Sequence, residues 1–125
     1  MIIIDYSDRR PIYEQITDRF RQLIVREVLK PEEQLPSVRV LAMELSINPN
    51  TIQRAYQELE RQGLIYSVKG KGSFVSPDRS YLKEQQAKLL QELSQCVDQA
   101  LELHMTPDEI LKYTEQLLKE GLSHD

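Results

Sequence analysis

Polar side chains suited to contacting base edges cluster in a short stretch of the chain that begins at Asn48. Asn and Gln can form two hydrogen bonds with adenine, and Arg can do the same with guanine. A proline follows Asn48 directly, which suits the first turn of a helix, and the backbone amides at a helix N-terminus also favour phosphate. This chemistry indicates contact with DNA. The candidate contact residues of the stretch are Asn48, Asn50, Thr51, Gln53 and Arg54.

Two lysines that alternate with glycines form a second candidate feature. Glycines permit close approach of the backbone to another molecule, but lysines in such a turn also suit an ordinary exposed hairpin. The residues around Asn48 also have alternative interpretations that do not involve bases. Asn48 and, upstream of it, Ser37 fit helix N-caps, a role compatible with phosphate contact. Arg54 is four residues from Glu58, the spacing of an ion pair on a solvated helix face. The residues of this second feature are Lys69, Gly70, Lys71 and Gly72.

Charge is distributed unevenly along the chain. The 125 residues carry a formal charge of -4, and an acidic total by itself disfavours a nucleic-acid partner because phosphate binding needs positive charge. Residues 1–78 hold 11 Lys and Arg against 11 Asp and Glu, whereas residues 79–125 hold 5 against 9. Between residues 36 and 75 the count is 5 against 3. The candidate DNA-contacting segment is therefore mildly basic, and the acidic total belongs to the C-terminal part.

Three helices and a hairpin must position these residues. The first helix is predicted from Pro11 to about Lys30, the second after Ser37 as N-cap, and the third from Asn48 to Gly63, which suits a left-handed C-terminal cap. The hydrophobic period then changes to two, which predicts two short strands around the glycine-containing turn. The apolar faces that we expect to pack together are Ile12, Ile16, Phe20, Leu23, Ile24 and Val28, then Val38, Leu41, Ala42 and Leu45, then Ile52, Ala55, Tyr56 and Leu59.

This order of elements defines the predicted fold class. It is mainly α with a small β-hairpin, and two helices joined by a short turn with a hairpin directly after them form a winged helix-turn-helix. A short polar stretch with Pro77 ends the hairpin. The sequence therefore predicts a winged helix-turn-helix DNA-binding domain over residues 1–76 and a helical tail, for dimerisation or effector binding, over residues 77–125.

The tail is predicted to form two helices. Apolar residues recur as a seam from residue 82 to residue 103. Thr106, Pro107 and Glu109 have the spacing of a capping box, which starts a second helix that we expect to end before Gly121. A hairpin of two helices cannot bury the apolar faces of both helices by itself, so we expect a partner chain to cover them. The predicted dimerisation residues are Leu82, Leu89, Leu93, Val97, Leu101, Ile110 and Leu117.

Other classes of protein are disfavoured by what the sequence lacks. Cys96 is the only cysteine, so no internal disulfide forms. No apolar stretch approaches the length of a signal-peptide core or a membrane span, which predicts a cytoplasmic protein without a membrane partner. The sequence has no Gly-rich phosphate loop, no Ser-His-Asp arrangement and no cluster with metal-ligand spacing. We therefore expect no enzyme activity, no catalytic residue, no metal and no cofactor.

Five motifs, in this order, cover the part of the chain between residues 9 and 76. Together they resemble the GntR family of bacterial transcription regulators, and the short two-helix tail is similar to that of the YtrA-like subfamily, whose C-terminal part is too small for the ligand pocket of larger relatives. The motifs are PIYEQI at residues 11–16, LPSVRVLA at 35–42, NPNTIQRAYQELE at 48–60, GLI at 63–65 and GKGSFV at 70–75.

The resemblance implies a role for each matching position. It implies that Ser37 and Arg39 contact DNA from the second helix, that the stretch beginning at Asn48 does so from the third, and that the lysine-bearing turn lies at the minor groove. Val40 departs from the pattern, since many members have glutamate after that arginine. For the subfamily, the implied role is a homodimeric repressor of its own operon, which often encodes an ABC transporter. The sequence names no small-molecule effector.

The prediction is therefore a homodimeric, sequence-specific repressor that binds double-stranded DNA at a palindromic operator. A rival hypothesis from another class is a winged helix that serves only as a docking surface for proteins, with a tail that binds a partner coil. The polar start of the third helix disfavours the rival because protein interfaces prefer an apolar centre.

Overall fold

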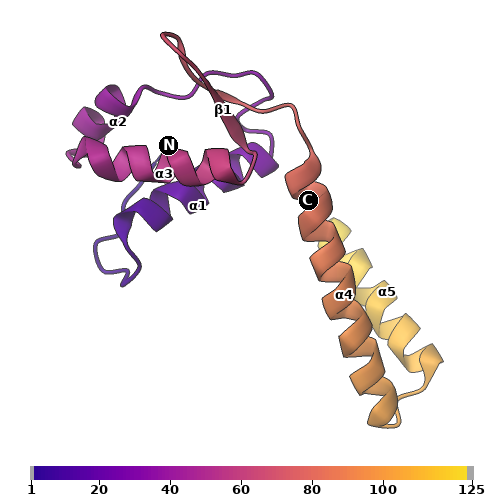
Figure 1. Cartoon of the computed structure of the whole chain (residues 1–125). Helices are drawn as coiled ribbons and strands as arrows, with labels where there is room; N and C mark the ends of the chain where they lie inside the picture. Colours follow the sequence, from indigo (N-terminus) through magenta and orange to yellow (C-terminus); the bar gives the residue numbers. More distant parts are fainter. Residues whose placement is uncertain (1, 124–125) are drawn as a thin grey trace. The chain divides into compact units, whose positions relative to one another are not determined.

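The computed structural model describes residues 2–123 of the chain. It contains five helices and one two-stranded sheet in this part of the chain (Figure 1). In chain order the elements are α1 (Ile12–Val25), α2 (Val38–Leu45), α3 (Pro49–Arg61), β1 (Ile65–Val68), β2 (Gly72–Val75), α4 (Ser80–Glu102) and α5 (Pro107–Ser123). The chain divides into two compact units, Met1–Lys83 and Glu84–Asp125. The first turn of α4 thus belongs to the first unit.

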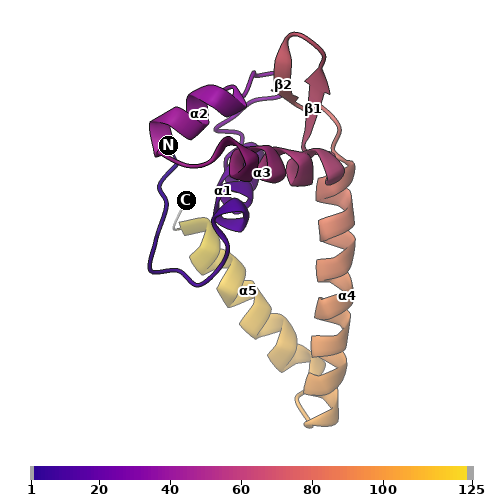
Figure 2. The same cartoon turned by 60° about the vertical axis from the view of Figure 1, so that its left-hand side comes forward.

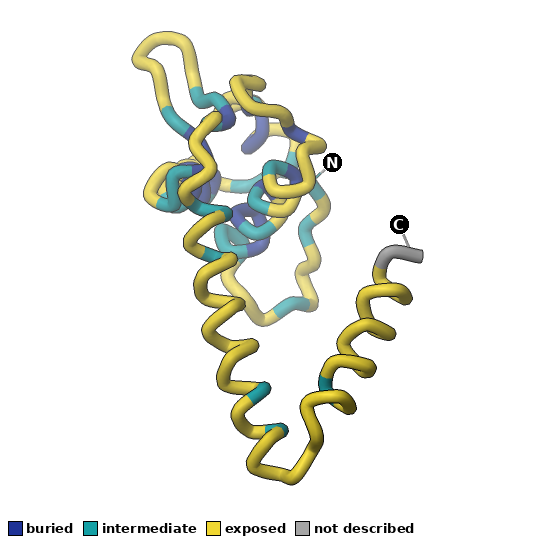
Figure 3. The backbone as a smooth tube through the Cα atoms, turned by 90° about the vertical axis from the view of Figure 1, so that its right-hand side faces the viewer, coloured by how far each residue is buried: buried dark blue, intermediate teal, exposed yellow. Residues whose placement is uncertain are grey.

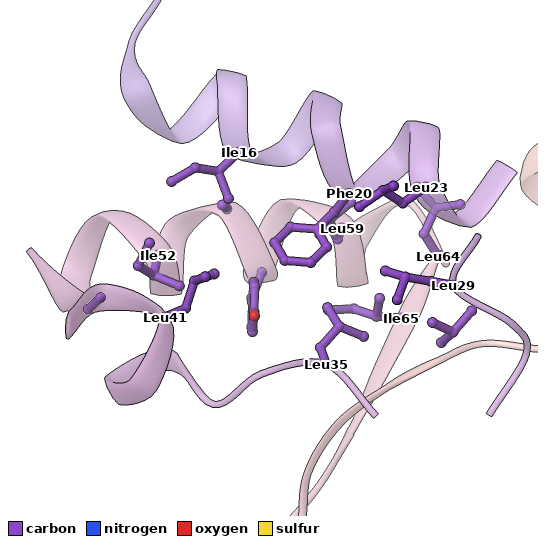
Figure 4. Close-up of a cluster of buried hydrophobic side chains, with 14 residues drawn as sticks. Ile16, Phe20, Leu23, Leu29, Leu35, Leu41, Ile52, Leu59, Leu64 and Ile65 are labelled. Atoms are coloured by element: carbon purple, nitrogen blue, oxygen red, sulfur yellow. The ribbon is translucent and has the colours of Figure 1, made fainter. Parts of the chain in front are cut away.

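Helix α3 is the centre of the first unit, because it packs against α1, α2 and β1. The four apolar residues predicted to form its inner face, Ile52, Ala55, Tyr56 and Leu59, are all buried. Phe20 of α1 meets the ring of Tyr56 edge-on, with centroids 5.6 Å apart, an arrangement favoured between aromatic rings. Figure 4 shows side chains from α1, α2, α3 and the following strand converging on one core. The core therefore holds α3 from three sides and leaves its polar face outward.

The end of α1 differs from the prediction. The helix was expected to continue to about Lys30 with Val28 on its buried face, but it ends at Val25. Val28 is 58% exposed, whereas Leu29 is 5% exposed and joins the core. A continued helix would place Glu27, four residues after the buried Leu23, on the inner face. Instead Glu27 adopts a left-handed backbone with φ of 57°, and the turn brings Leu29 into the core.

Both helix starts of the helix-turn-helix are capped as predicted. The Ser37 hydroxyl accepts a hydrogen bond from the Val40 amide at 3.1 Å, and the Asn48 side-chain oxygen accepts one from the Asn50 amide at 2.8 Å. Ser46 ends α2 in a left-handed conformation, with φ of 55°. These caps satisfy amides that a helix N-terminus otherwise leaves free, so they fix where α2 and α3 begin.

Tyr56 links α3 to the segment before α2. Its hydroxyl donates a 2.7 Å hydrogen bond to the Pro36 carbonyl, and burial raises the pKa of Tyr56 above its ordinary value, so the donor proton stays in place. We expect Tyr56→Phe to lower the free energy of unfolding by about 1 kcal/mol, the usual net contribution of one such bond. Urea unfolding measures this change. Tyr6→Phe, at a 72% exposed tyrosine, is the matched control, and equal stability of the two variants would contradict the expectation.

The hairpin follows α3 as predicted, after Gly63 in the expected left-handed conformation. Strands β1 and β2 are antiparallel, with Ile65 opposite Val75 and Val68 opposite Gly72. The turn between them places Gly70 at φ of 79° and Gly72 at φ of 122°, which favours glycine at both positions. In Figure 2 the segment that leads into α2 runs beside β2. We call the hairpin with its turn, residues 65–75, the wing.

The second unit consists of the rest of α4 and of α5. The predicted capping box forms, because the Thr106 amide donates to the Glu109 carboxylate at 3.0 Å and the Glu109 amide donates to the Thr106 hydroxyl at 3.1 Å. Helix α5 was expected to end before Gly121 but runs through it to Ser123. Gly121 keeps a helical backbone here, because glycine permits a left-handed cap without requiring one.

Most side chains of α4 and α5 are exposed, as the colouring of Figure 3 shows. Of the predicted dimerisation residues, Leu89, Leu93, Leu101 and Leu117 are exposed, and Val97 and Ile110 are half-buried. Leu82 differs from them. It lies within the first unit and lines a small apolar pocket with Ile24, Leu64 and Val75. No helix within residues 2–123 is both long and apolar enough to cross a membrane.

Candidate nucleic-acid interface

The outer face of α3 and the wing enclose a groove. It is lined by Gln53, Gln57 and Glu60 from successive turns of α3, and by Lys69 and Lys71 from the turn of the wing. The spacing of three and four residues explains why the three α3 side chains share one face. Ser37, at the start of α2, lines the same groove, as do Gly70 and Gly72. The structure thus brings together predicted contact residues from α2, α3 and the wing.

Four polar side chains of this groove are available to a ligand. Gln53, Gln57, Lys69 and Lys71 are exposed, and their side chains form no hydrogen bond or ion pair with any residue that the structure describes. Two amides that can pair with base edges therefore lie beside two ammonium groups that can pair with phosphates. The sequence places Gln57, four residues after Gln53, on the same outward polar face of the helix, although it is not among the predicted contact residues.

A second group of predicted residues lies at the N-terminal end of α3. Asn50 is exposed and Thr51 half-buried in the first turn, next to the capping Asn48. Arg39 of α2 lines a shallow depression that reaches Pro49 at the start of α3. The Arg39 guanidinium is exposed and makes no hydrogen bond or ion pair within the described part of the chain. This end of a second helix is the part that contacts base edges in helix-turn-helix proteins.

Arg54 is separated from these groups. Its guanidinium carbon lies 3.8 Å from the centre of the Tyr13 ring on α1, a cation–π distance, and Arg54 does not line the groove beside the wing. The alternative pairing with Glu58 does not form either. Glu58 instead accepts hydrogen bonds from Arg61 at 2.9 Å and from Gln62 at 2.9 Å.

The charge of Glu58 is held in place by these neighbours. Hydrogen bonds from Arg61 and Gln62 lower the pKa of the Glu58 carboxyl to about 2, so the group stays ionised throughout the physiological range. Glu58 lines a polar depression with Tyr13 and Arg21 on the α1 side of α3. The acidic side chain is thereby neutralised by a cation on a face other than that of the wing groove.

Lys71 gives a test of the charge of the groove. We expect Lys71→Ala to weaken binding to all duplex sequences alike, because an ammonium on a phosphate carries no sequence information. In the homodimer expected from the sequence, loss of one phosphate contact per chain also reduces the slope of log K against log salt by about 1.8, roughly 0.9 for each contact. Titrations of an arbitrary duplex at several salt concentrations measure the slope. An unchanged slope would contradict the assignment, and Lys88→Ala, at an exposed lysine of α4 without an ion pair within the described residues, is the matched control for the loss of one positive charge.

Comparison with known proteins decides the class of this interface. The family model described as "Bacterial regulatory proteins, gntR family" matches residues 12–75, which include all of α1, α2, α3 and the wing. The uncharacterized HTH-type transcriptional regulator YhcF of Bacillus subtilis is 40% identical over 108 residues, covering 86% of this chain and 89% of YhcF. The chain belongs to the GntR family. The HTH-type transcriptional repressor YtrA of Bacillus subtilis is 46% identical over 76 residues, 61% of this chain and 58% of YtrA, and the chain is a YtrA-like member.

Solved structures agree with this fold. A transcriptional regulator from Oenococcus oeni covers 94% of this chain and 99% of its own, with 34% identity and a TM-score of 0.71. The AraR DNA-binding domain in complex with operator ORE1 covers 61% of this chain and 93% of its own, with 28% identity and a TM-score of 0.52. The GntR family and these relatives are transcription regulators, so this chain is a transcriptional regulator of the winged helix-turn-helix type and not an enzyme.

Proposed function

We propose that this GntR-family regulator is a homodimeric repressor that binds a palindromic operator. The observation that carries the proposal is the groove between α3 and the wing, where Gln53 and Gln57 face Lys69 and Lys71 without internal partners. Such a groove suits a base edge with a phosphate chain beside it. The contacts proposed are Arg39 and the first turns of α3 to bases, and Ser37 and the wing lysines to phosphates, with the wing at the minor groove.

The homodimer is supported by the exposed leucines of α4 and α5. Leu89, Leu93 and Leu117 are each at least half exposed in the single chain, and large contiguous apolar surfaces mark interaction sites. A second copy of the same seam gives a closed two-fold arrangement, the commonest form of homo-oligomer. Two-fold symmetry in the protein calls for two-fold symmetry in the DNA, so the half-sites lie about one helical turn apart.

The operator that we propose lies ahead of the chain's own operon, with ABC-transporter genes among those it controls, as the resemblance to the YtrA-like subfamily implies. Relatives named as repressors support the direction of control. Arg54 is the contact residue that this geometry supports least, since its guanidinium is held against Tyr13.

Selection from random duplex DNA tests the proposal. The full-length protein is incubated with a random library at moderate salt, and bound sequences are amplified and sequenced over several rounds. We expect enrichment of a palindrome, and footprinting on the DNA upstream of the chain's own gene should then protect a matching site. Enrichment of no sequence would overturn the proposal in favour of a protein-docking winged helix. Enrichment of a single half-site would overturn the dimeric part alone.

A further inference from the structure

The wing is hydrogen-bonded along one edge to the segment that precedes α2. The Leu35 amide donates to the Ser73 carbonyl at 2.9 Å, and the Val75 amide donates to the Glu33 carbonyl at 2.9 Å. Gln34 lies between these two bonds and forms a bridge with Phe74. Residues 33–35 therefore act as a short third strand beside β2, and they place the Gln34 side chain next to the turn that carries the lysines.

Gln34 reaches the tip of the wing with its side chain. Its Nε2 donates a 2.8 Å hydrogen bond to the Lys71 carbonyl. A Cβ atom added at Gly72 would lie 2.9 Å from that Nε2, closer than unbonded atoms tolerate, and Gly72 has a left-handed φ of 122°. The backbone at position 72 thus favours glycine, and any larger residue there would require the Gln34 side chain to move.

The same segment is fixed to α3 at its other end. Leu35 is buried in the core, and the carbonyl of Pro36 accepts the hydrogen bond from Tyr56. A continuous path of short contacts consequently runs from the Lys71 carbonyl through Gln34, Leu35 and Pro36 to α3. Ser67 of β1 also reaches α3, through a 3.4 Å hydrogen bond to the Glu60 carboxylate, whereas the Gln34 contact is made to the turn itself.

We propose that Gln34 is a positioning residue for the wing, which holds the backbone of Lys71 at a fixed place relative to α3. The inference rests on the proposed function, because it assumes that the wing lysines contact phosphates. The amide of Gln34 acts through the Lys71 carbonyl, and its removal lets the turn sample positions from which the two ammonium groups no longer reach the backbone of the same duplex that α3 contacts.

The first experiment uses no DNA. Trypsin cleaves after lysine, so the bond between Lys71 and Gly72 is a substrate whose carbonyl is the one that Gln34 holds. Cleavage of a local segment follows the population of its open form. We expect Gln34→Ala to raise the rate of cleavage after Lys71 about three- to tenfold, relative to cleavage after Lys88, as loss of one hydrogen bond implies. An unchanged ratio, measured by mass spectrometry, would overturn the proposal.

The second experiment separates positioning from a direct or structural effect. On an arbitrary duplex at low salt, Gln34→Ala should weaken binding about three- to tenfold in the otherwise unchanged protein, and by less than about twofold in a Lys69→Ala, Lys71→Ala background. Equal losses in both backgrounds would mean that Gln34 acts without the lysines, and would overturn the proposal. Gln91→Ala, the same substitution at an exposed position of α4 away from the apolar seam, is the control.

The two experiments also distinguish this inference from the proposed function. Selection of no palindrome would overturn the operator hypothesis, yet cleavage after Lys71 and binding to arbitrary DNA would still be measurable. Conversely, a selected palindrome together with an unchanged cleavage ratio would leave the operator hypothesis standing and remove the role of Gln34. Thermal unfolding of each variant checks that the first unit remains folded during the measurements.

Discussion

Leu93→Asp is expected to convert the dimer into a monomer and to weaken operator binding at least about 100-fold. Leu93 is 54% exposed in the single chain, so aspartate costs little in the monomer. In a two-fold interface along the apolar seam, the same change buries a carboxylate without a partner, which costs several kcal/mol. A monomer also loses the gain in effective concentration that comes from two linked binding units.

Sedimentation and gel-shift titration measure the two effects of Leu93→Asp. Gln91→Asp introduces the same charge into α4 at an exposed position away from the seam, and we expect it to remain dimeric. A Leu93→Asp protein that sediments as a dimer would show that α4 does not form the interface. A monomeric variant that keeps full operator affinity would show instead that dimerisation is not needed for binding.

Arg39→Ala is expected to weaken binding of the proposed dimer to the selected operator at least about 30-fold, because each half-site loses one bidentate base contact of roughly 1–3 kcal/mol. The guanidinium is exposed beside the start of α3 and has no internal partner among the described residues, so its removal leaves the fold intact. Because the contact is to a base, the loss should be much smaller on arbitrary DNA.

Titration of both duplexes at one salt concentration tests the role of Arg39. Arg26→Ala removes the same charge at an exposed position just after α1 and is the control for net charge. A loss of equal size on the operator and on arbitrary DNA would reassign Arg39 to a phosphate. Selection repeated with the Arg39→Ala protein should give a motif that is less specific at one position of each half-site.

The parts of the fold that could be predicted are those with local signals. Ser37 and Asn48 are N-caps whose hydrogen-bond partners lie two or three residues away. Short stretches of sequence are therefore sufficient to predict where α2 and α3 begin. The end of α1 has no such signal. A longer helix would bury Glu27, whereas the observed turn buries Leu29 instead. The difference depends on packing against the core, which includes α3, and not on residues adjacent in the chain.

The candidate site shows the same division. Gln53 and the wing lysines were predicted from residue type and spacing, and the structure places them in one groove. The position of Arg54 depends on Tyr13, 41 residues earlier in the chain, and the hold of Gln34 on the wing depends on a bridge across 37 residues. Contacts between residues far apart in the chain produce no periodic pattern in the sequence. Neither the Arg54–Tyr13 contact nor the Gln34–Lys71 contact could therefore be predicted from a single sequence.

The exposed leucines of the tail bear on how the regulator responds to its own abundance. A seam that is left open within one chain is closed only by association, and association depends on the concentration of chains. In the proposed dimer, operator occupancy therefore rises with the square of the protein concentration while monomers are in excess. A repressor of its own operon with this property would shut off synthesis over a narrow range of expression and keep its copy number steady from cell to cell.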